Sequence, residues 1–415
     1  MLELRFLQNT ETNSEMAFRN LMKTLSQLLA IFCVVFSVGV CLGEQFSVAT
    51  IFSDGMVLQR EMPVRVWGWA DVGSTVAVEF KGQKKTTVTD KDGAWQIGLD
   101  AMKARSAGGK MIVECGDESK TINDVIVGEV WFAGGQSNMA FTMKGMAKHL
   151  AEGRGMVAEA PQSEIRVRRV RGNDRPAPLK DLADGMVWER CTPDAVLNHS
   201  AVAYVFAHRL HRELGVPVGI IDCSWGGKPI EPFIPSDEMK GHPTLSRLAE
   251  LSKAEDADAI RDMPGGTFVR SSSWYAGRIF NARIAPVAPY TIRGAIWYQG
   301  ESNSGTGEDP RDYEHKMRAL IRGWREAWKN PELPFYFVQL PQWKSYAWTW
   351  LREEQRRVLD MPNTGMAVTI DLDNNNASQP DIVVSNVQRY LTDVVSAPVG
   401  AFFHDILSGD DEVIG

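Results

Sequence analysis

Residues 124–139 limit the possible folds of this chain more than any other stretch. Two apolar runs, residues 125–127 and 130–133, predict a strand that is buried on both faces, as in a parallel sheet. The strand runs into Gly134 and Gly135, where small residues permit a sharp, close-packed turn. Ser137 follows at the kind of strand end where open α/β sheets place their ligand crevice. The stretch alone leaves two roles open for Ser137, a nucleophile or the N-cap of a helix.

Residues 46–124 have a hydrophobic period of two. Apolar side chains alternate in the candidate strands 64–69, 76–80, 95–99 and 111–115. Short strands at this spacing, with no helical stretch between them, are typical of a β-sandwich. We therefore predict a small β-sandwich domain over residues 44–124.

Strands and helices alternate from residue 125 onward. Apolar runs at residues 218–223 and 292–298 predict two more buried strands, and residues 198–214 and 313–328 repeat with the helical period. Further candidate strands lie at residues 165–170, 335–340 and 366–370. Strands that are separated by helices imply a parallel sheet covered on both faces. The predicted fold class is α/β, with a three-layer α/β/α domain over residues 125–372 that follows the β-sandwich.

Three of the predicted strands end in polar, glycine-containing loops, at residues 135–138, 225–227 and 299–301. Parallel strands end at the same edge of a sheet, so the three loops should meet there. A hydroxyl group, backbone N–H donors and amide side chains would then lie close together, and acyl transfer needs such a set of groups. The spacing differs from the G-x-S-x-G elbow, because Met139 stands where the second glycine belongs.

The composition excludes some classes of function. The 415 residues carry a formal net charge of −7, which argues against a nucleic-acid or anionic-membrane partner. Residues 90–93 resemble the start of a calcium loop but lack the later glutamate, so a hairpin turn is predicted there. His208 and His211 lie on a predicted helix with no further ligand motif nearby, and we predict surface positions for both. No metal site and no cofactor is expected.

The N-terminal residues 1–43 predict export. Lys23 precedes an apolar run over residues 28–40 that is short for a membrane span and is followed by small residues. We expect a signal peptide that is cleaved near Gly43, and a periplasmic or extracellular protein. An uncleaved membrane anchor is the alternative.

The three polar loops resemble those of a known family. Their motifs GQSNM, WGG and IWYQGESN resemble the characteristic blocks of SGNH-type hydrolases, and more narrowly those of sialate O-acetylesterase-like carbohydrate esterases. The resemblance runs from about residue 46 to residue 371. It implies an SGNH-hydrolase-like domain and a secreted serine esterase that removes O-acetyl groups from sialic acid or other acetylated carbohydrates. The partner that it implies is an acetylated carbohydrate substrate.

The resemblance also implies a catalytic role for residues of the three loops. Ser137 would be the nucleophile. The oxyanion hole would consist of the backbone N–H groups of Ser137 and of Gly226 or Gly227, together with the side chain of Gln299.

The floor of the substrate pocket would be shaped by Gln136, Asn138 and Glu301. For Gln299 and Glu301 the alternative role is that of a hydrogen-bonded loop anchor. Lys228 follows the second loop and could meet a substrate carboxylate, but we predict a solvated surface position for it.

The general base is not recognisable in this sequence. The family has a histidine in a D-I-H-P segment soon after an I-D-L strand end. The I-D-L strand end is present at residues 370–372, but the one later D-I pair is followed by Val383, which cannot accept a proton. His404 is the one imidazole further on and the remaining candidate base. Residues 373–415 no longer resemble the family and are predicted to be a divergent or frameshifted tail.

Two hypotheses about function follow from this departure. The first is a carbohydrate O-acetylesterase whose activity is impaired in this chain. The second is a non-catalytic relative that binds carbohydrate in the same crevice.

Overall fold

The computed structural model describes residues 45–160, 164–264, 269–305, 309–342 and 346–369. The chain divides into two compact units, Met1–Gln45 and Phe46–Gly415, and the architecture that follows is that of the second unit. The predicted signal peptide and the predicted divergent tail lie outside the described residues. Within the described ranges, every helix is too short or too polar to cross a membrane.

The N-terminal region consists of short strands, as its hydrophobic period predicts. These strands are β1 (Ser47–Val48), β2 (Val57–Gln59), β3 (Val64–Trp69), β4 (Thr75–Phe80), β5 (Gln83–Val88), β6 (Ala94–Leu99) and β7 (Arg105–Cys115). Strands β1, β3 and β6 form an antiparallel sheet, and β5, β4, β7 and the first part of β8 (Glu118–Gly135) form an antiparallel ladder. The four candidate strands correspond to β3, β4, β6 and β7, while their packing as a sandwich stays a prediction. The sequence does not predict β5, because its side chains are polar on both faces.

Strand β8 crosses the predicted boundary between residues 124 and 125. Its first part pairs with β7 in antiparallel, and its second part pairs in parallel with β11 (Val218–Asp222) and β12 (Gly294–Tyr298). At the junction Asp124 takes a positive φ of 56°, and its carboxylate accepts hydrogen bonds from Arg166 and Arg190. One continuous strand therefore crosses the predicted boundary, and the division into two domains there stays a prediction.

The α/β region is built on one sheet with β8 at its centre. The strand order is β10-β9-β11-β8-β12-β13-β14, and all neighbouring pairs are parallel except β10 with β9. The remaining strands are β9 (Ile165–Arg169), β10 (Trp188–Arg190), β13 (Phe335–Val338) and β14 (Thr364–Ala367). The predicted parallel sheet is confirmed, with one antiparallel strand at its edge.

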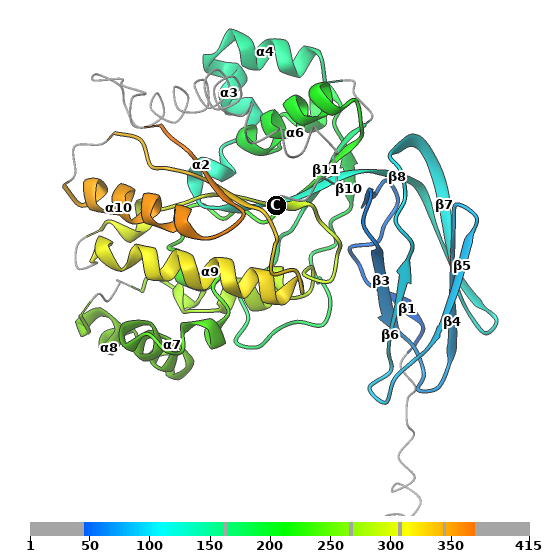
Figure 1. Ribbon diagram of the computed structural model, residues 1–415, viewed down its shortest axis with the longest axis horizontal. Coiled ribbons are helices and arrows are strands. Elements are labelled where there is room, and N and C mark those ends of the chain that lie inside the picture. Colours follow the sequence, from blue (N-terminus) through cyan, green and yellow to red (C-terminus); the bar gives the residue numbers. More distant parts are fainter. Residues whose placement is uncertain (1–44, 161–163, 265–268, 306–308, 343–345, 370–415) are drawn as a thin grey trace, which may run out of the picture. The chain divides into compact units, whose positions relative to one another are not determined.

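Helices cover both faces of this sheet (Figure 1). Trp131 and Phe132 are neighbours on β8, so their side chains point to opposite faces. Trp131 packs against Phe206 of α6 (Ala201–Leu214), with ring centroids 5.0 Å apart. Phe132 packs against Trp324 of α9 (Tyr313–Ala327), with centroids 5.1 Å apart. The predicted three-layer α/β/α arrangement is therefore confirmed.

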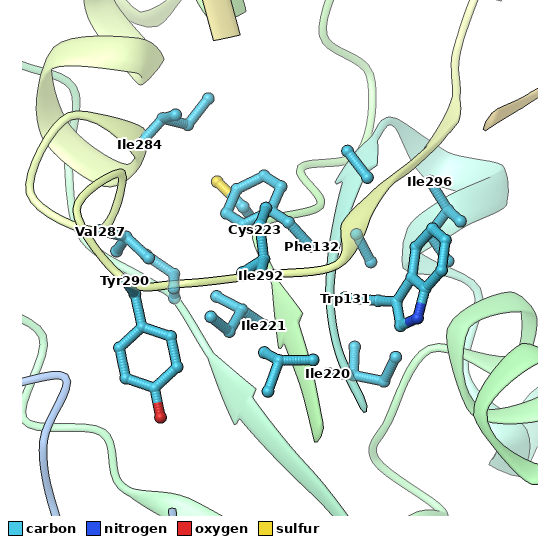
Figure 2. Packing of buried hydrophobic residues seen from close by; sticks show 14 of the residues in the cluster. Trp131, Phe132, Ile220, Ile221, Cys223, Ile284, Val287, Tyr290, Ile292 and Ile296 are labelled. Atoms are coloured by element: carbon cyan, nitrogen blue, oxygen red, sulfur yellow. The ribbon is translucent and has the colours of Figure 1, made fainter. Parts of the chain in front are cut away.

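Apolar side chains of neighbouring strands form the core of this sheet. Ile220 and Ile221 of β11 pair with Trp131 and Phe132 of β8, and all four are fully buried. Figure 2 shows their side chains within the apolar cluster. The other helices are α2 (Ser137–Ala140), α3 (Met143–His149), α4 (Ala151–Ala158), α5 (Pro193–Val196), α7 (Pro243–Ala254), α8 (Ala257–Asp262) and α10 (Tyr346–Arg357). Short single-turn segments lie at Glu231–Phe233, Ser236–Met239, Ser272–Trp274, Phe280–Ile284, Glu301–Asn303, Pro310–Asp312 and Val358–Asp360.

Candidate active site

The three polar loops meet at one edge of the sheet. Strand β8 lies between β11 and β12, so all three strands end side by side. Trp225 N–H donates to the carbonyl of Gly135 at 2.9 Å, which ties the second loop to the first. Gln136 N–H donates to the carbonyl of Tyr298 at 3.0 Å, which ties the first loop to the third. The predicted convergence of the loops is confirmed.

Only glycine fits the turn that ends β8. Gly135 has a φ of 136°, and a Cβ atom there would lie 2.1 Å from the carbonyl oxygen of Tyr298. A Cβ atom on Gly134 would lie 2.8 Å from the ring of Trp324. The two glycines therefore let the chain turn sharply against the neighbouring strand and helix.

Ser137 is exposed at this turn between two buried neighbours. Gln136 is 3% exposed and Asn138 is 6% exposed, whereas Ser137 faces solvent. Ser137 is the first residue of α2, and the N-cap position belongs to Gln136. The alternative role of Ser137 as the helix N-cap is therefore wrong. Its Oγ lies 3.5 Å from Nε2 of Gln136, at the limit of a weak hydrogen bond.

Backbone donors for an oxyanion lie beside this hydroxyl. A Cβ atom built on Gly226 would lie 3.8 Å from Cα and 3.9 Å from Cβ of Ser137, so the second loop packs directly against the serine. Gly227 follows with a φ of 68°, and both glycines are exposed. The N–H of Ser137 opens a helix and so has no acceptor in that helix. The two residues that carry these backbone donors, Ser137 and Gly226, therefore lie side by side.

Gln299 anchors the loops beneath the serine. The residue is fully buried, and its Nε2 donates to Oε1 of Gln136 at 3.0 Å and to Oδ1 of Asn303 at 2.7 Å. Its Oε1 accepts a hydrogen bond from the Tyr313 hydroxyl at 2.7 Å. Both amide hydrogens are therefore in use, and the predicted donation from this side chain to the oxyanion is not what the structure shows. The alternative role of Gln299, a loop anchor, fits the contacts.

Gln136, Asn138 and Glu301 lie together under the serine turn. Oε1 of Gln136 also accepts from the backbone N–H of Ser302 at 3.1 Å, so Gln136 ties the first loop to the third. Asn138 Nδ2 donates to Oε1 of Glu301. Oε2 of Glu301 is buried and has no partner among the described residues. Burial raises the pKa of Glu301 to about 7, because a desolvated carboxylate loses free energy relative to the neutral acid.

A buried ion pair supports this arrangement from below, and sequence reasoning missed it. Nζ of Lys316 lies 2.6 Å from Oε1 of Glu231, and both side chains are almost fully buried. Glu231 in turn accepts hydrogen bonds of 3.0 and 3.1 Å from Nδ2 of Asn303, which holds Gln299. The one available signal was the position of Lys316 next to Met317, on the apolar side of the predicted helix.

None of the imidazoles in the described residues forms a hydrogen bond with the Ser137 hydroxyl. These histidines are His149, His199, His208, His211, His242 and His315. His208 is 3% exposed, so the predicted surface position is wrong for this residue. Burial lowers the pKa of His199 to about 4 and also lowers the pKa of His208. His404, the I-D-L segment and the D-I pair lie outside the described residues.

Comparison with known proteins gives one consistent result. A family model described as "Carbohydrate esterase, sialic acid-specific acetylesterase" matches residues 127–380. The sialate O-acetylesterase of Mus musculus is 30% identical over 388 residues, which cover 80% of this chain and 68% of the relative. The sialate O-acetylesterase of Homo sapiens is 30% identical over 368 residues, with 80% and 66% covered. A solved carbohydrate acetylesterase from Xanthomonas citri superimposes with a TM-score of 0.67 at 29% identity, over 83% of this chain and 74% of that one.

The fold, the site and these similarities define the class of the protein, which is an ester hydrolase of the carbohydrate esterase type. Within that class, the chain belongs to the family of sialic acid-specific acetylesterases. The expected family and the expected enzyme class are confirmed. The described residues contain no group of three or more His, Cys, Asp and Glu side chains that could hold a metal ion.

Proposed function

We propose that the protein hydrolyses O-acetyl esters of carbohydrates, with Ser137 as the nucleophile. The observation that carries this proposal is the position of Ser137. It is exposed where three parallel strands end, and the backbone of Gly226 lies against it. Only Gln136, which is buried, separates this serine from the closely packed Gly135 at the end of β8.

The reaction would proceed through an acetyl-serine intermediate. Oγ of Ser137 attacks the acetyl carbonyl and loses its proton to solvent water, and the carbonyl oxygen becomes an oxyanion. The N–H groups of Ser137 and Gly226 donate to this oxyanion, which lowers the energy of the transition state. The ester C–O bond then breaks, and the sugar oxygen leaves with a proton. Water hydrolyses the acetyl-serine in a second step and releases acetate.

The proton on Oγ has no acceptor among the described residues. Serine hydrolases that lose their base keep about 10³–10⁴-fold catalysis over water, which comes from the oxyanion donors and from binding. We therefore propose that this chain is an impaired esterase, slower than a relative with a complete triad. The alternative is a non-catalytic relative that binds acetylated carbohydrate at the same strand ends.

Sialic acid is the sugar we propose to carry the acetyl group. The name of the matching family and the names of the mammalian relatives support this substrate. We also propose export, on the basis of the charged and apolar pattern of residues 1–43.

Acetate release from 9-O-acetyl-N-acetylneuraminic acid and from 4-nitrophenyl acetate tests the nucleophile. We expect slow hydrolysis by the parent protein and background rates for Ser137→Ala. Ser106→Ala, a change of the same kind at an exposed serine of β7, should keep the parent rate. Equal rates for the parent and Ser137→Ala would show that the nucleophile is assigned wrongly. If the parent releases no acetate but binds the acetylated sugar, the non-catalytic alternative is correct.

A further inference from the structure

Two cations lie against the Trp225 ring, one residue before Gly226. Cζ of Arg283 is 3.7 Å from the ring centroid of Trp225, and Nζ of Lys228 is 4.7 Å from it. Such distances are typical of cation–π contacts. Trp225, Lys228 and Arg283 are called the Trp225 cluster below.

Both cations of the cluster are buried. Lys228 is 8% exposed and Arg283 is 5% exposed, so the predicted solvated position of Lys228 is wrong. Nζ of Lys228 donates to the hydroxyl of Ser273, and Nε of Arg283 donates to the carbonyl of Gly172 at 3.0 Å. Both acceptors are neutral. Neither cation forms an ion pair with any carboxylate in the described part of the chain.

Buried cations without an ion-pair partner are unusual, because burial removes the hydration of the charge. Burial is the main cause that lowers the pKa of Lys228, and the positive charge of Arg283 adds to it. Asp174 attracts Lys228, but its carboxylate lies 3.7 Å from Arg278. The cluster therefore holds more positive than negative charge.

The surroundings of the cluster add to this excess of positive charge. Arg171 is half-exposed and repels Arg283, whereas Asp222 and Asp184 attract it. Both carboxylates have arginine partners of their own, because Asp222 pairs with Arg171 at 3.3 Å and Asp184 pairs with Arg168 at 2.8 Å. Arg270 is exposed and stacks on Trp274 at 5.2 Å. A positive patch in a chain with a net charge of −7 marks this place as one where an anion is favoured.

The cluster lies next to the serine. Trp225 and Gly226 are adjacent in the chain, with Cα atoms about 3.8 Å apart. Gly226 packs against Ser137. A sugar whose acetyl group reaches Ser137 would therefore bring its other substituents to the half-exposed Trp225 ring.

We propose that the Trp225 cluster binds a carboxylate of the substrate, so that the site selects acetylated sugars that carry an acid group. This inference rests on the proposed function, because it places the acetyl group at Ser137. Sialic acids and hexuronic acids both supply such a carboxylate. Lys228 and Arg283 supply the positive charge, which a neutral sugar would not use.

Binding of matched acid and neutral sugars by the full chain tests the cluster without requiring catalysis. Isothermal titration calorimetry would compare N-acetylneuraminic acid with its methyl ester, and glucuronic acid with glucose. We expect about tenfold tighter binding of at least one acid than of its neutral counterpart, as a charge-assisted hydrogen bond gives. Preference for N-acetylneuraminic acid identifies sialic acid as the source of the carboxylate, and preference for glucuronic acid alone identifies a uronic acid.

Two variants test whether Lys228 causes the preference for the acid sugar. Lys228→Met keeps the length of the side chain against Trp225 and removes the charge, so the preference for the acid should fall at least several-fold. Lys91→Met removes the same charge at a side chain that is 86% exposed, and it should leave the preference unchanged. A parent protein that binds acid and neutral sugar equally, or neither, overturns the proposal, and so does a Lys228→Met variant with the full preference.

The acetate assay separates this inference from the proposed function. A protein that prefers the acid but gives Ser137-independent hydrolysis supports the carboxylate site and contradicts the nucleophile. A protein with Ser137-dependent hydrolysis and no preference for the acid contradicts the carboxylate site alone.

Discussion

Glu301 should make the stability of the protein depend on pH in one direction. Its folded pKa is raised from 4.5 to about 7, because burial disfavours the carboxylate. The folded state therefore holds the proton more tightly than the unfolded state does. The stability from this proton is fully present below the unfolded pKa, and it is lost as pH rises from about 4.5 through 7. At 1.36 kcal/mol for each pH unit between the two values, the loss is about 3 kcal/mol.

The variant Glu301→Gln isolates this effect. Its amide oxygen can still accept the hydrogen bond from Asn138, but the side chain cannot ionise. Urea unfolding of parent and variant would be measured from pH 4.5 to pH 8. We expect the variant to gain about 3 kcal/mol relative to the parent over this range. The control Glu118→Gln, at an exposed position on β8, should show no such gain.

A difference between parent and variant that does not change with pH would refute this reasoning. It would mean that Glu301 is hydrated or paired in solution, so that its carboxylate is not desolvated. The comparison uses the difference of two proteins, so titration of buried histidines cancels.

Three further predictions concern the glycine turn, the Lys316–Glu231 ion pair and the general base, which is not found among the described residues. Gly135→Ala should lower the free energy of unfolding in urea by more than about 3 kcal/mol, because the new Cβ atom would overlap a carbonyl of β12. The control Gly155→Ala should be neutral or stabilising, because no atom lies within 4 Å of a Cβ atom built there. Lys316→Met should lower the free energy of unfolding by about 3–5 kcal/mol, because it leaves the Glu231 carboxylate buried without its ion-pair partner. The double variant Lys316→Met with Glu231→Gln should recover part of this stability. Equal losses in the single and double variants would contradict the role of the ion pair. Free imidazole should raise the rate of acetate release by the parent protein and leave the rate of Ser137→Ala at background. A parent rate that does not change with the imidazole concentration would show that the chain supplies its own base.

The sequence predicts the α/β architecture well, because hydrophobic periods carry it. The runs that became β8, β11 and β12 are apolar on both faces, and their glycine-containing ends mark the edge where the loops meet. Strand β5 escapes prediction because it pairs with β4 alone and buries neither face fully.

The roles of individual side chains depend on partners that are far apart in the chain. Gln299 has the residue type of an oxyanion donor, but its amide hydrogens are donated to Asn303 and to Gln136, which lies 163 residues away in the chain. The sequence predicts a surface position for Lys228, because it does not reveal that the rings of Trp225 and Trp274 both lie against this side chain. Hydrophobic periodicity predicts which face of a helix or strand is buried, but it does not predict which polar side chains form hydrogen bonds there.

The central claim is that Ser137 takes up the acetyl group, and mass spectrometry of the protein after incubation with an acetyl ester tests it most directly. The described residues supply no base beside Ser137, so we expect slow hydrolysis of the intermediate and accumulation of acetyl-serine. We predict one added acetyl group, located on the peptide that contains Ser137 and absent from Ser137→Ala. Acetate release with no acetyl group on that peptide, or with the acetyl group on another residue, would contradict the claim.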